Sequence, residues 1–134
     1  MAAPPTPGER RRSRERALEL LYEAEIKGIT PSEVLEGLPM PPDEYAASLV
    51  RRVEECRVEA DELIGSAAIG WPVERLAVID RLVLRVAVAE LLDPQGPPVA
   101  VVIDEAVELA KAYSTEDSGG FVNGVLSTLS SRLR

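Results

Sequence analysis

The sequence predicts an all-α protein, a compact bundle of six or seven helices without a β-sheet. The main observation is the stretch from Trp71 to Asp93, in which nearly every position between Leu76 and Leu92 is Leu, Val, Ile or Ala. A helix that is apolar on almost all sides is buried, so other helices must surround it. The other apolar segments repeat at three- to four-residue spacing, which is typical of helices with one buried face.

The first predicted helix runs from about Glu9 to Lys27 and ends at Gly28, a residue suited to the left-handed conformation that closes many helices. The proline-rich residues 1–8 before it have nothing to bury. We therefore predict a disordered N-terminal tail over residues 1–8 and a single helical domain over residues 9–134.

The next segments are also predicted to be helical. Thr30 and Glu33 have the spacing of a capping box, which predicts a short helix ending near Gly37. From Asp43 to Gly70 the pattern fits either one bent helix or two. Five acidic residues here are spaced around the predicted helix surface, so we interpret them as solvated and not catalytic. They are Glu54, Glu55, Glu59, Asp61 and Glu62.

The central apolar helix has recognisable ends. Pro72 suits the first position of a helix, because its missing N–H costs nothing there. The prolines after Asp93 cannot continue it. The stretch is too short and too charged to cross a membrane.

Two helices are predicted after the central one. Apolar residues at helical spacing fill Val99 to Tyr113, and residues 114–118 break that helix and cap the last one. Gly119 and Gly120 occupy the first turn of the last helix, where small residues leave its amides open. Gly124, further along, is predicted to permit close helix packing.

The composition excludes several kinds of site. Cys56 is the only cysteine and there are 0 histidines, so the chain can form no internal disulfide, zinc site or histidine-based triad. No glycine-rich nucleotide loop or nucleophile motif is present. We therefore predict no enzyme and no cofactor, and interpret Cys56 as structural. The N-terminus has no signal sequence, which predicts the cytoplasm.

The charge is distributed unevenly, although the total is −8. Five arginines and two glutamates give residues 1–16 a charge of +3, so the rest of the chain carries −11. Acidic side chains normally stabilise a helix N-terminus, so arginines there point to a bound anion such as phosphate. The predicted anion ligands are Arg10, Arg11, Arg12 and Arg14. The alternative is a solvated basic end that aids solubility.

Tyr22 lies further along the same predicted helix. Its ring could stack an unpaired RNA base, as aromatic side chains often do. The alternative is a core aromatic with its hydroxyl at the surface.

Three segments resemble the NusB family of bacterial antitermination factors. They are RRRSRERALELLYEAEIKG (10–28), WPVERLAVIDRLVLRVAVAELL (71–92) and VVIDEAVELAKAYSTEDSGGFVNGVL (101–126). Residues 29–70 match only in helical character. The resemblance implies about seven helices in two packed helical subdomains.

The resemblance also implies a function. The protein would pair with the ribosomal protein NusE and bind boxA RNA of ribosomal RNA leader transcripts. With other Nus factors and RNA polymerase, the pair would promote read-through of terminators. A basic partner suits the acidic body, and it would strengthen an RNA contact that is weak and salt-dependent alone.

The family's functional positions carry over as expectations. The arginine motif falls on Arg10, Arg11, Arg12 and Arg14, and the tyrosine of the first helix on Tyr22. The aromatic at the start of the last helix falls on Phe121, with Asp117 beside the RNA-facing edge. The acidic residue of the central helix, Asp80, would face the partner or the RNA. Relatives often carry a basic residue where this chain has Gly120, which removes one phosphate contact, and Phe121 could instead pack in the core with Val125.

Two other functions fit the residues. The first is a helical protein–protein adaptor or a homodimerising module without direct RNA binding. The second is a fragment of an enzyme, because some ribosomal RNA methyltransferases carry a similar domain ahead of a catalytic one. The chain ends at Arg134 without a cofactor-binding half, so this second function needs a longer gene.

Overall fold

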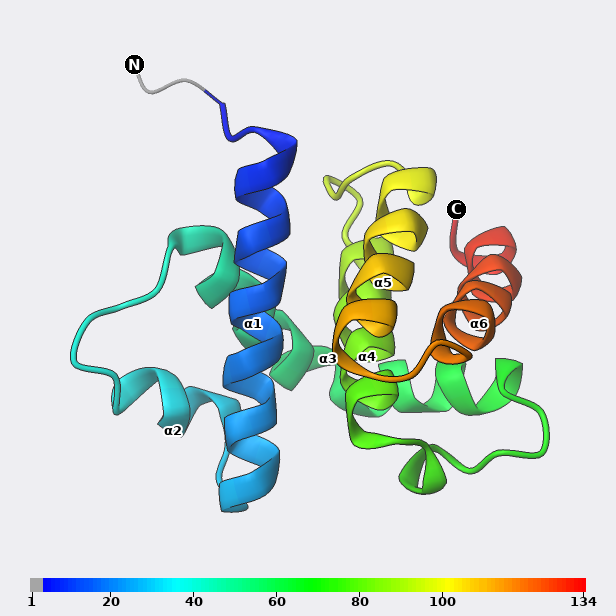
Figure 1. Cartoon of the computed structure of the whole chain (residues 1–134), viewed down its shortest axis with the longest axis horizontal. Helices are drawn as coiled ribbons and strands as arrows, with labels where there is room; N and C mark the ends of the chain where they lie inside the picture. The colour runs from blue at the N-terminus through cyan, green and yellow to red at the C-terminus, as the bar shows by residue number, and fades with distance from the viewer. Residues whose placement is uncertain (1–3) are drawn as a thin grey trace.

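The computed structural model describes residues 4–134, and all regular secondary structure in this part of the chain is helical, with no strand. Six α-helices and one 3₁₀ helix (η1) follow one another (Figure 1). They are α1 (Pro7–Lys27), α2 (Pro31–Glu36), α3 (Glu44–Ala67), η1 (Val73–Arg75), α4 (Val78–Leu92), α5 (Val99–Tyr113) and α6 (Ser118–Leu133). The predicted all-α class is confirmed.

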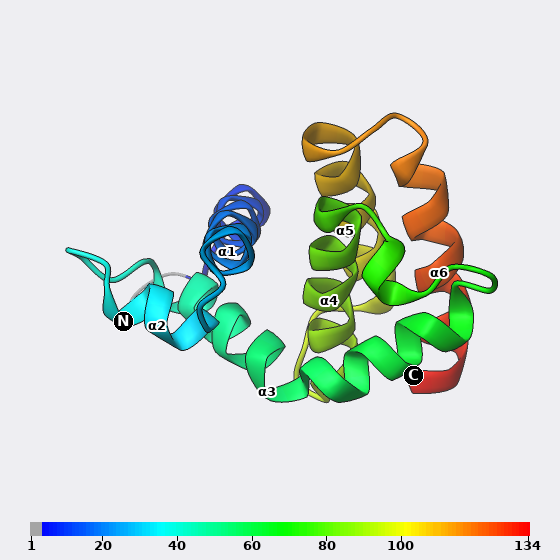
Figure 2. The ribbon, with the colours of Figure 1, turned by 90° about the horizontal axis from the view of Figure 1, so that it is seen from below.

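The helices form two packed groups. α1, α2 and the first part of α3 lie on one side, and α4, α5 and α6 lie on the other (Figure 1). α3 continues beneath both groups, as the second view shows (Figure 2), and α1 also packs against α4. The arrangement agrees with the two helical subdomains that the resemblance implied.

α4 is the central helix, as predicted. Every residue from Leu82 to Leu91 is buried, and the helix packs against α1, α3, α5 and α6. Ten successive buried positions explain why the sequence shows no amphipathic stripe here.

The predicted start of the central helix is wrong. α4 begins at Val78, because Pro72 opens only the 3₁₀ turn of η1, after which Leu76 and Ala77 are extended. The extended backbone places the Leu76 side chain in the core, whereas Trp71 is 58 % exposed. A proline fits the start of either helix type, so Pro72 did not distinguish a short 3₁₀ helix from the start of the long central α-helix.

α1 begins two residues earlier than predicted. The Thr6 hydroxyl accepts a hydrogen bond from the Glu9 N–H at 3.1 Å and caps the helix, which brings Pro7 and Gly8 of the expected tail into its first turn. The part of that tail from 1 to 3 lies outside the described residues. At the other end Gly28 has φ of 66°, so the predicted left-handed cap is confirmed.

The structure decides whether residues 43–70 form one helix or two, and it shows how the short helix before them begins. The capping box of Thr30 and Glu33 is confirmed. α3 is one continuous helix of 24 residues. The interpretation of its acidic residues as only solvated is wrong for Glu54, which accepts hydrogen bonds from the N–H and hydroxyl of Ser32 in α2. It is also wrong for Asp61, which accepts hydrogen bonds of 2.8 and 2.9 Å from the buried Arg85. This ion pair fastens α3 to α4.

The prediction for Gly124 is wrong, whereas the interpretation of Cys56 agrees with the structure. Gly124 faces open space, so the predicted close packing at this glycine is wrong. Gly119 instead makes the close contact, since a Cβ there would lie 3.0 Å from the Lys111 side chain. Cys56 is half-buried and unbonded, and burial raises the pKa of its thiol, which suits a structural role.

Candidate nucleic-acid interface

The four predicted arginines occupy the first two turns of α1, but their guanidinium groups point to different places. Two of them are paired with carboxylates of α4 and α5, and two are not. The prediction that they converge on one anion is therefore wrong. Each arginine has to be considered separately.

Arg14 is part of the core. Its side chain and that of Glu90 are each 3 % exposed, and two hydrogen bonds of 2.9 Å join the guanidinium to the carboxylate. Burial lowers the pKa of Arg14, but the hydrogen bonds and charge of Glu90 outweigh this and leave it raised. Arg14 thus fastens α1 to α4, and at 3 % exposure its guanidinium is almost inaccessible to an external phosphate.

Tyr45, at the start of α3, connects this buried pair to the surface. Its hydroxyl donates a hydrogen bond to the Glu90 carboxylate. Burial, followed by the charge of Glu90, raises the pKa of Tyr45 well above its usual range. The outer face of the ring carries the guanidinium of Arg10, whose carbon lies 3.8 Å from the ring centroid. The buried network therefore fixes an aromatic surface on which Arg10 stacks.

Arg11 points away from Tyr45 toward α5. Its guanidinium donates two hydrogen bonds to the Glu105 carboxylate, of 2.9 and 3.0 Å. The Arg11 side chain is 53 % exposed and that of Glu105 is 14 % exposed. The hydrogen bond from Arg11 is the main reason that the pKa of Glu105 is lowered. Arg11 is thus neutralised at the surface, unlike Arg14 in the core.

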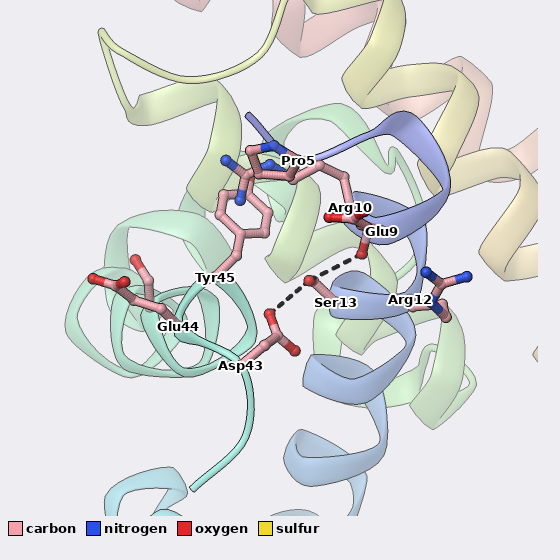
Figure 3. A pocket seen from close by; sticks show the side chains of 9 residues that line it. Pro5, Glu9, Arg10, Arg12, Ser13, Asp43, Glu44 and Tyr45 are labelled. Carbon is pink, nitrogen blue, oxygen red and sulfur yellow. Dashed lines mark hydrogen bonds between the residues drawn. The ribbon is translucent and has the colours of Figure 1, made fainter. Parts of the chain in front are cut away.

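Arg10 and Arg12 have no ion-pair partner within residues 4–134. Both line a cleft of about 580 Å³ between the first turns of α1 and the start of α3 (Figure 3). The cleft is lined by Pro5, Glu9, Arg10, Arg12, Ser13, Asp43, Glu44, Tyr45 and Ser48. It therefore combines two arginines that form no ion pair in residues 4–134, an aromatic ring and the carboxylates of Glu9, Asp43 and Glu44.

The base of this cleft is held by Ser13 and Asp43. The Ser13 hydroxyl lies 2.6 Å from the Asp43 carboxylate and 3.1 Å from the backbone oxygen of Glu9 (Figure 3). The same carboxylate accepts a hydrogen bond from the Ala46 N–H and caps α3. One short polar contact thus fixes the spacing of the two helices that form the cleft.

Tyr22 is 41 % exposed and lies on α1, about 18 Å beyond Arg10 at the usual rise of 1.5 Å per residue. It does not line the cleft. Its ring is a partly solvated surface, separate from the arginines.

The other three predicted residues lie together near the start of α4 and α6. Asp80 accepts a hydrogen bond of 3.1 Å from the Ser118 hydroxyl, and its second carboxylate oxygen is buried with no partner in the described part of the chain. Asp117 is exposed at the N-terminus of α6, and Phe121 is partly buried against the core. The structure brings these three together but keeps them apart from the arginines, which lie at the opposite end of α4 (Figure 1).

The sequence reasoning missed Tyr45, Glu90 and Glu105. Glu90 carried a usable signal, because a carboxylate inside an otherwise apolar buried helix needs a cationic partner. Tyr45 and Glu105 carried none, since each has its role only through the packing of α3 and α5 beside α1.

The arrangement is that of a helical binding protein with a polar cleft that combines arginines, carboxylates and an aromatic ring. Residues 4–134 contain no cluster of three or more His, Cys, Asp or Glu side chains that could hold a metal ion. Across the same described range, no helix has the length and apolar character to cross a membrane.

Comparison with known proteins identifies the family of this helical binding protein. The model of the NusB family matches residues 11–131, so the chain belongs to the NusB family. The transcription antitermination protein NusB of Thermobifida fusca (strain YX) is 47 % identical over 126 residues, which cover 91 % of this chain and 89 % of that protein.

Solved structures support the same family assignment. NusB of T. maritima has a TM-score of 0.83 at 35 % identity, covering 98 % of this chain and 93 % of that one. A structure of antitermination factors NusB and NusE in complex with dsRNA has a TM-score of 0.77 at 32 % identity, covering 92 % of this chain and 96 % of the matched chain. The resemblance inferred from three sequence segments is thus confirmed over almost the whole chain.

Proposed function

We propose that this protein is a transcription antitermination factor without enzymatic activity. It binds single-stranded boxA-type RNA of ribosomal RNA leader transcripts and pairs with a NusE ribosomal protein. Together with other Nus factors it acts on RNA polymerase, in the bacterial cytoplasm. The name of the Thermobifida fusca relative and the NusB–NusE–dsRNA structure support the proposal.

The observation that carries RNA binding is the free pair of Arg10 and Arg12 beside the cleft. Arg10 is held on the ring of Tyr45 at 3.8 Å, so it is preorganised for a ligand without being neutralised. Phosphate needs a cation, whereas the amino groups of a base need acceptors such as those of Asp43 and Glu44. A cleft that offers both suits a nucleotide better than a simple anion.

The remaining predicted residues are assigned to the same function. Tyr22 and Phe121 would stack or pack against bases along the strand, and Asp117 would lie at the RNA-facing edge. Asp80 would influence the partner side indirectly, because its hydrogen bond to Ser118 holds the turn between α5 and α6. Arg14 would contribute by positioning α1, and Arg11 would contact phosphate only after leaving Glu105.

A basic partner protein would supply RNA affinity that this chain lacks by itself. Only a few cations face the RNA, and the body beyond residue 16 carries −11, which repels a polyanion. A basic ribosomal protein would bind the acidic surface and extend the cationic track.

The experiment is a titration of boxA-like RNA with and without purified NusE at matched salt. We expect the partner to raise RNA affinity at least about tenfold, as added phosphate contacts do. Equal affinity in the two titrations would contradict the proposed partnership.

The second candidate function is a protein–protein adaptor, possessing no RNA site of its own. The observation that favours it is the internal neutralisation of Arg11 and Arg14. RNA binding by the isolated chain, lost when Arg10 and Arg12 are replaced, would exclude it.

A further inference from the structure

Resting on the proposed RNA function, we propose that Glu105 competes with the RNA backbone for Arg11 and thereby sets the affinity of the site. In the free protein Arg11 is held by Glu105. RNA that is already anchored on Arg10 and Arg12 delivers a neighbouring phosphate, which displaces the carboxylate. Glu105 is then a residue that limits binding.

The first argument is position. Arg10 and Glu105 line a second hollow of about 510 Å³ between the starts of α1 and α5, so a strand that contacts Arg10 can extend to the Arg11–Glu105 pair. Its guanidinium uses two donors on Glu105, at 2.9 and 3.0 Å. Phosphate oxygens accept the same pair of parallel hydrogen bonds. The carboxylate therefore occupies the geometry that a phosphate would need.

The second argument is the contrast between two ion pairs of the same helix. Arg14 and Glu90 are each 3 % exposed, so no ligand can reach them without opening the core. Arg11 is 53 % exposed, and its long side chain can turn into solvent while Glu105, at 14 %, stays in place. An exposed ion pair is weak enough for a second anion to replace it. The ion pair of Arg14 is thus permanent, whereas the ion pair of Arg11 can be exchanged for one with another anion.

The third argument concerns selectivity. A free phosphate ion must displace Glu105 unaided, whereas a strand held at Arg10 and Arg12 presents its next phosphate at high effective concentration. Arg11 therefore becomes available to a polymer and remains closed to small anions. A second bridge between the same helices, from the Tyr113 hydroxyl to Glu15 at 2.7 Å, keeps α1 and α5 together when Arg11 leaves.

The test measures single-stranded RNA binding by Glu105→Gln, Glu108→Gln, Arg11→Ala and the double variant Arg11→Ala with Glu105→Gln. Glu108 is the matched control, because it lies one turn further on α5, is exposed and loses the same charge. We expect Glu105→Gln to raise affinity about two- to fivefold, the range of an exposed ion pair, and Glu108→Gln to have a smaller effect.

The double variant decides between a direct and a general effect. We expect the double variant to bind RNA no better than Arg11→Ala, because without Arg11 the Glu105 carboxylate has no arginine for which to compete with RNA. A gain from Glu105→Gln that persists without Arg11 would reveal charge removal alone and overturn the proposal, as would the absence of any gain. If wild type and all variants fail to bind RNA, the proposed function fails with it.

A direct readout is the NMR signal of the Arg11 Nε–H, which donates to Glu105. RNA should shift this signal in the wild type, whereas inorganic phosphate at the same total phosphate concentration should not. A signal unchanged by bound RNA would show that Arg11 stays on Glu105, and would overturn the exchange.

Discussion

Arg14 and Glu90 form an enclosed ion pair, with both side chains 3 % exposed and two hydrogen bonds of 2.9 Å between them. Removing one partner leaves the other charged and buried. We expect Arg14→Ala to lower the free energy of unfolding by about 3–5 kcal/mol. Urea unfolding followed by circular dichroism measures this loss.

The control for that variant is Arg11→Ala, which breaks an exposed pair and should leave the unfolding midpoint almost unchanged. Equal destabilisation by the two variants would refute the distinction between a structural and an exchangeable arginine.

Tyr45 is predicted to have two separable roles, one for its hydroxyl and one for its ring. Tyr45→Phe removes the hydrogen bond to Glu90, so stability should fall by about 1.5 kcal/mol while RNA affinity stays close to wild type. Tyr45→Leu also removes the surface under Arg10, and RNA affinity should fall about three- to tenfold. Comparing both variants by urea unfolding and RNA titration tests this, and an equal RNA loss in both would assign the effect to the hydroxyl.

The Arg11–Glu105 pair predicts a pH dependence. The hydrogen bond from Arg11 lowers the pKa of Glu105 below its ordinary 4.5, so the unfolded chain binds the proton more readily. The stabilisation from this carboxylate is present above that value and is lost as pH falls through the lower, folded-state pKa. We therefore expect the small stability advantage of wild type over Glu105→Gln to shrink as the pH falls from 7 to below 4.5. An advantage that is constant over this range would contradict the pairing.

The end of α1 and the boundaries of α2 and α5 could be predicted because local chemistry decides them. Gly28, the Thr30 capping box and the helical spacing of 99–113 act within a turn or two of chain. The start of α4 could not be predicted in this way, since Pro72 suits a single 3₁₀ turn equally well. Which of the two forms depends on whether Leu76 or Trp71 enters the core, and that is a property of the packed structure.

The candidate site was predictable in composition but not in geometry. The charge pattern located the arginines at the correct end of α1. Their different environments depend on Glu90 and Glu105, which packing brings from residues far along the chain. The cleft depends equally on Tyr45, which lies in the segment that resembled the family only in helical character.

The central claim is that Arg10 and Arg12 hold RNA at the cleft. The most direct measurement is a titration of single-stranded boxA-like RNA into wild type, into Arg10→Glu with Arg12→Glu, and into Arg51→Glu with Arg75→Glu. The last pair also consists of exposed arginines without an ion-pair partner in residues 4–134, but it lies outside the cleft. The account predicts that only the first double variant abolishes binding while its melting temperature is retained; equal losses in the two variants would contradict it.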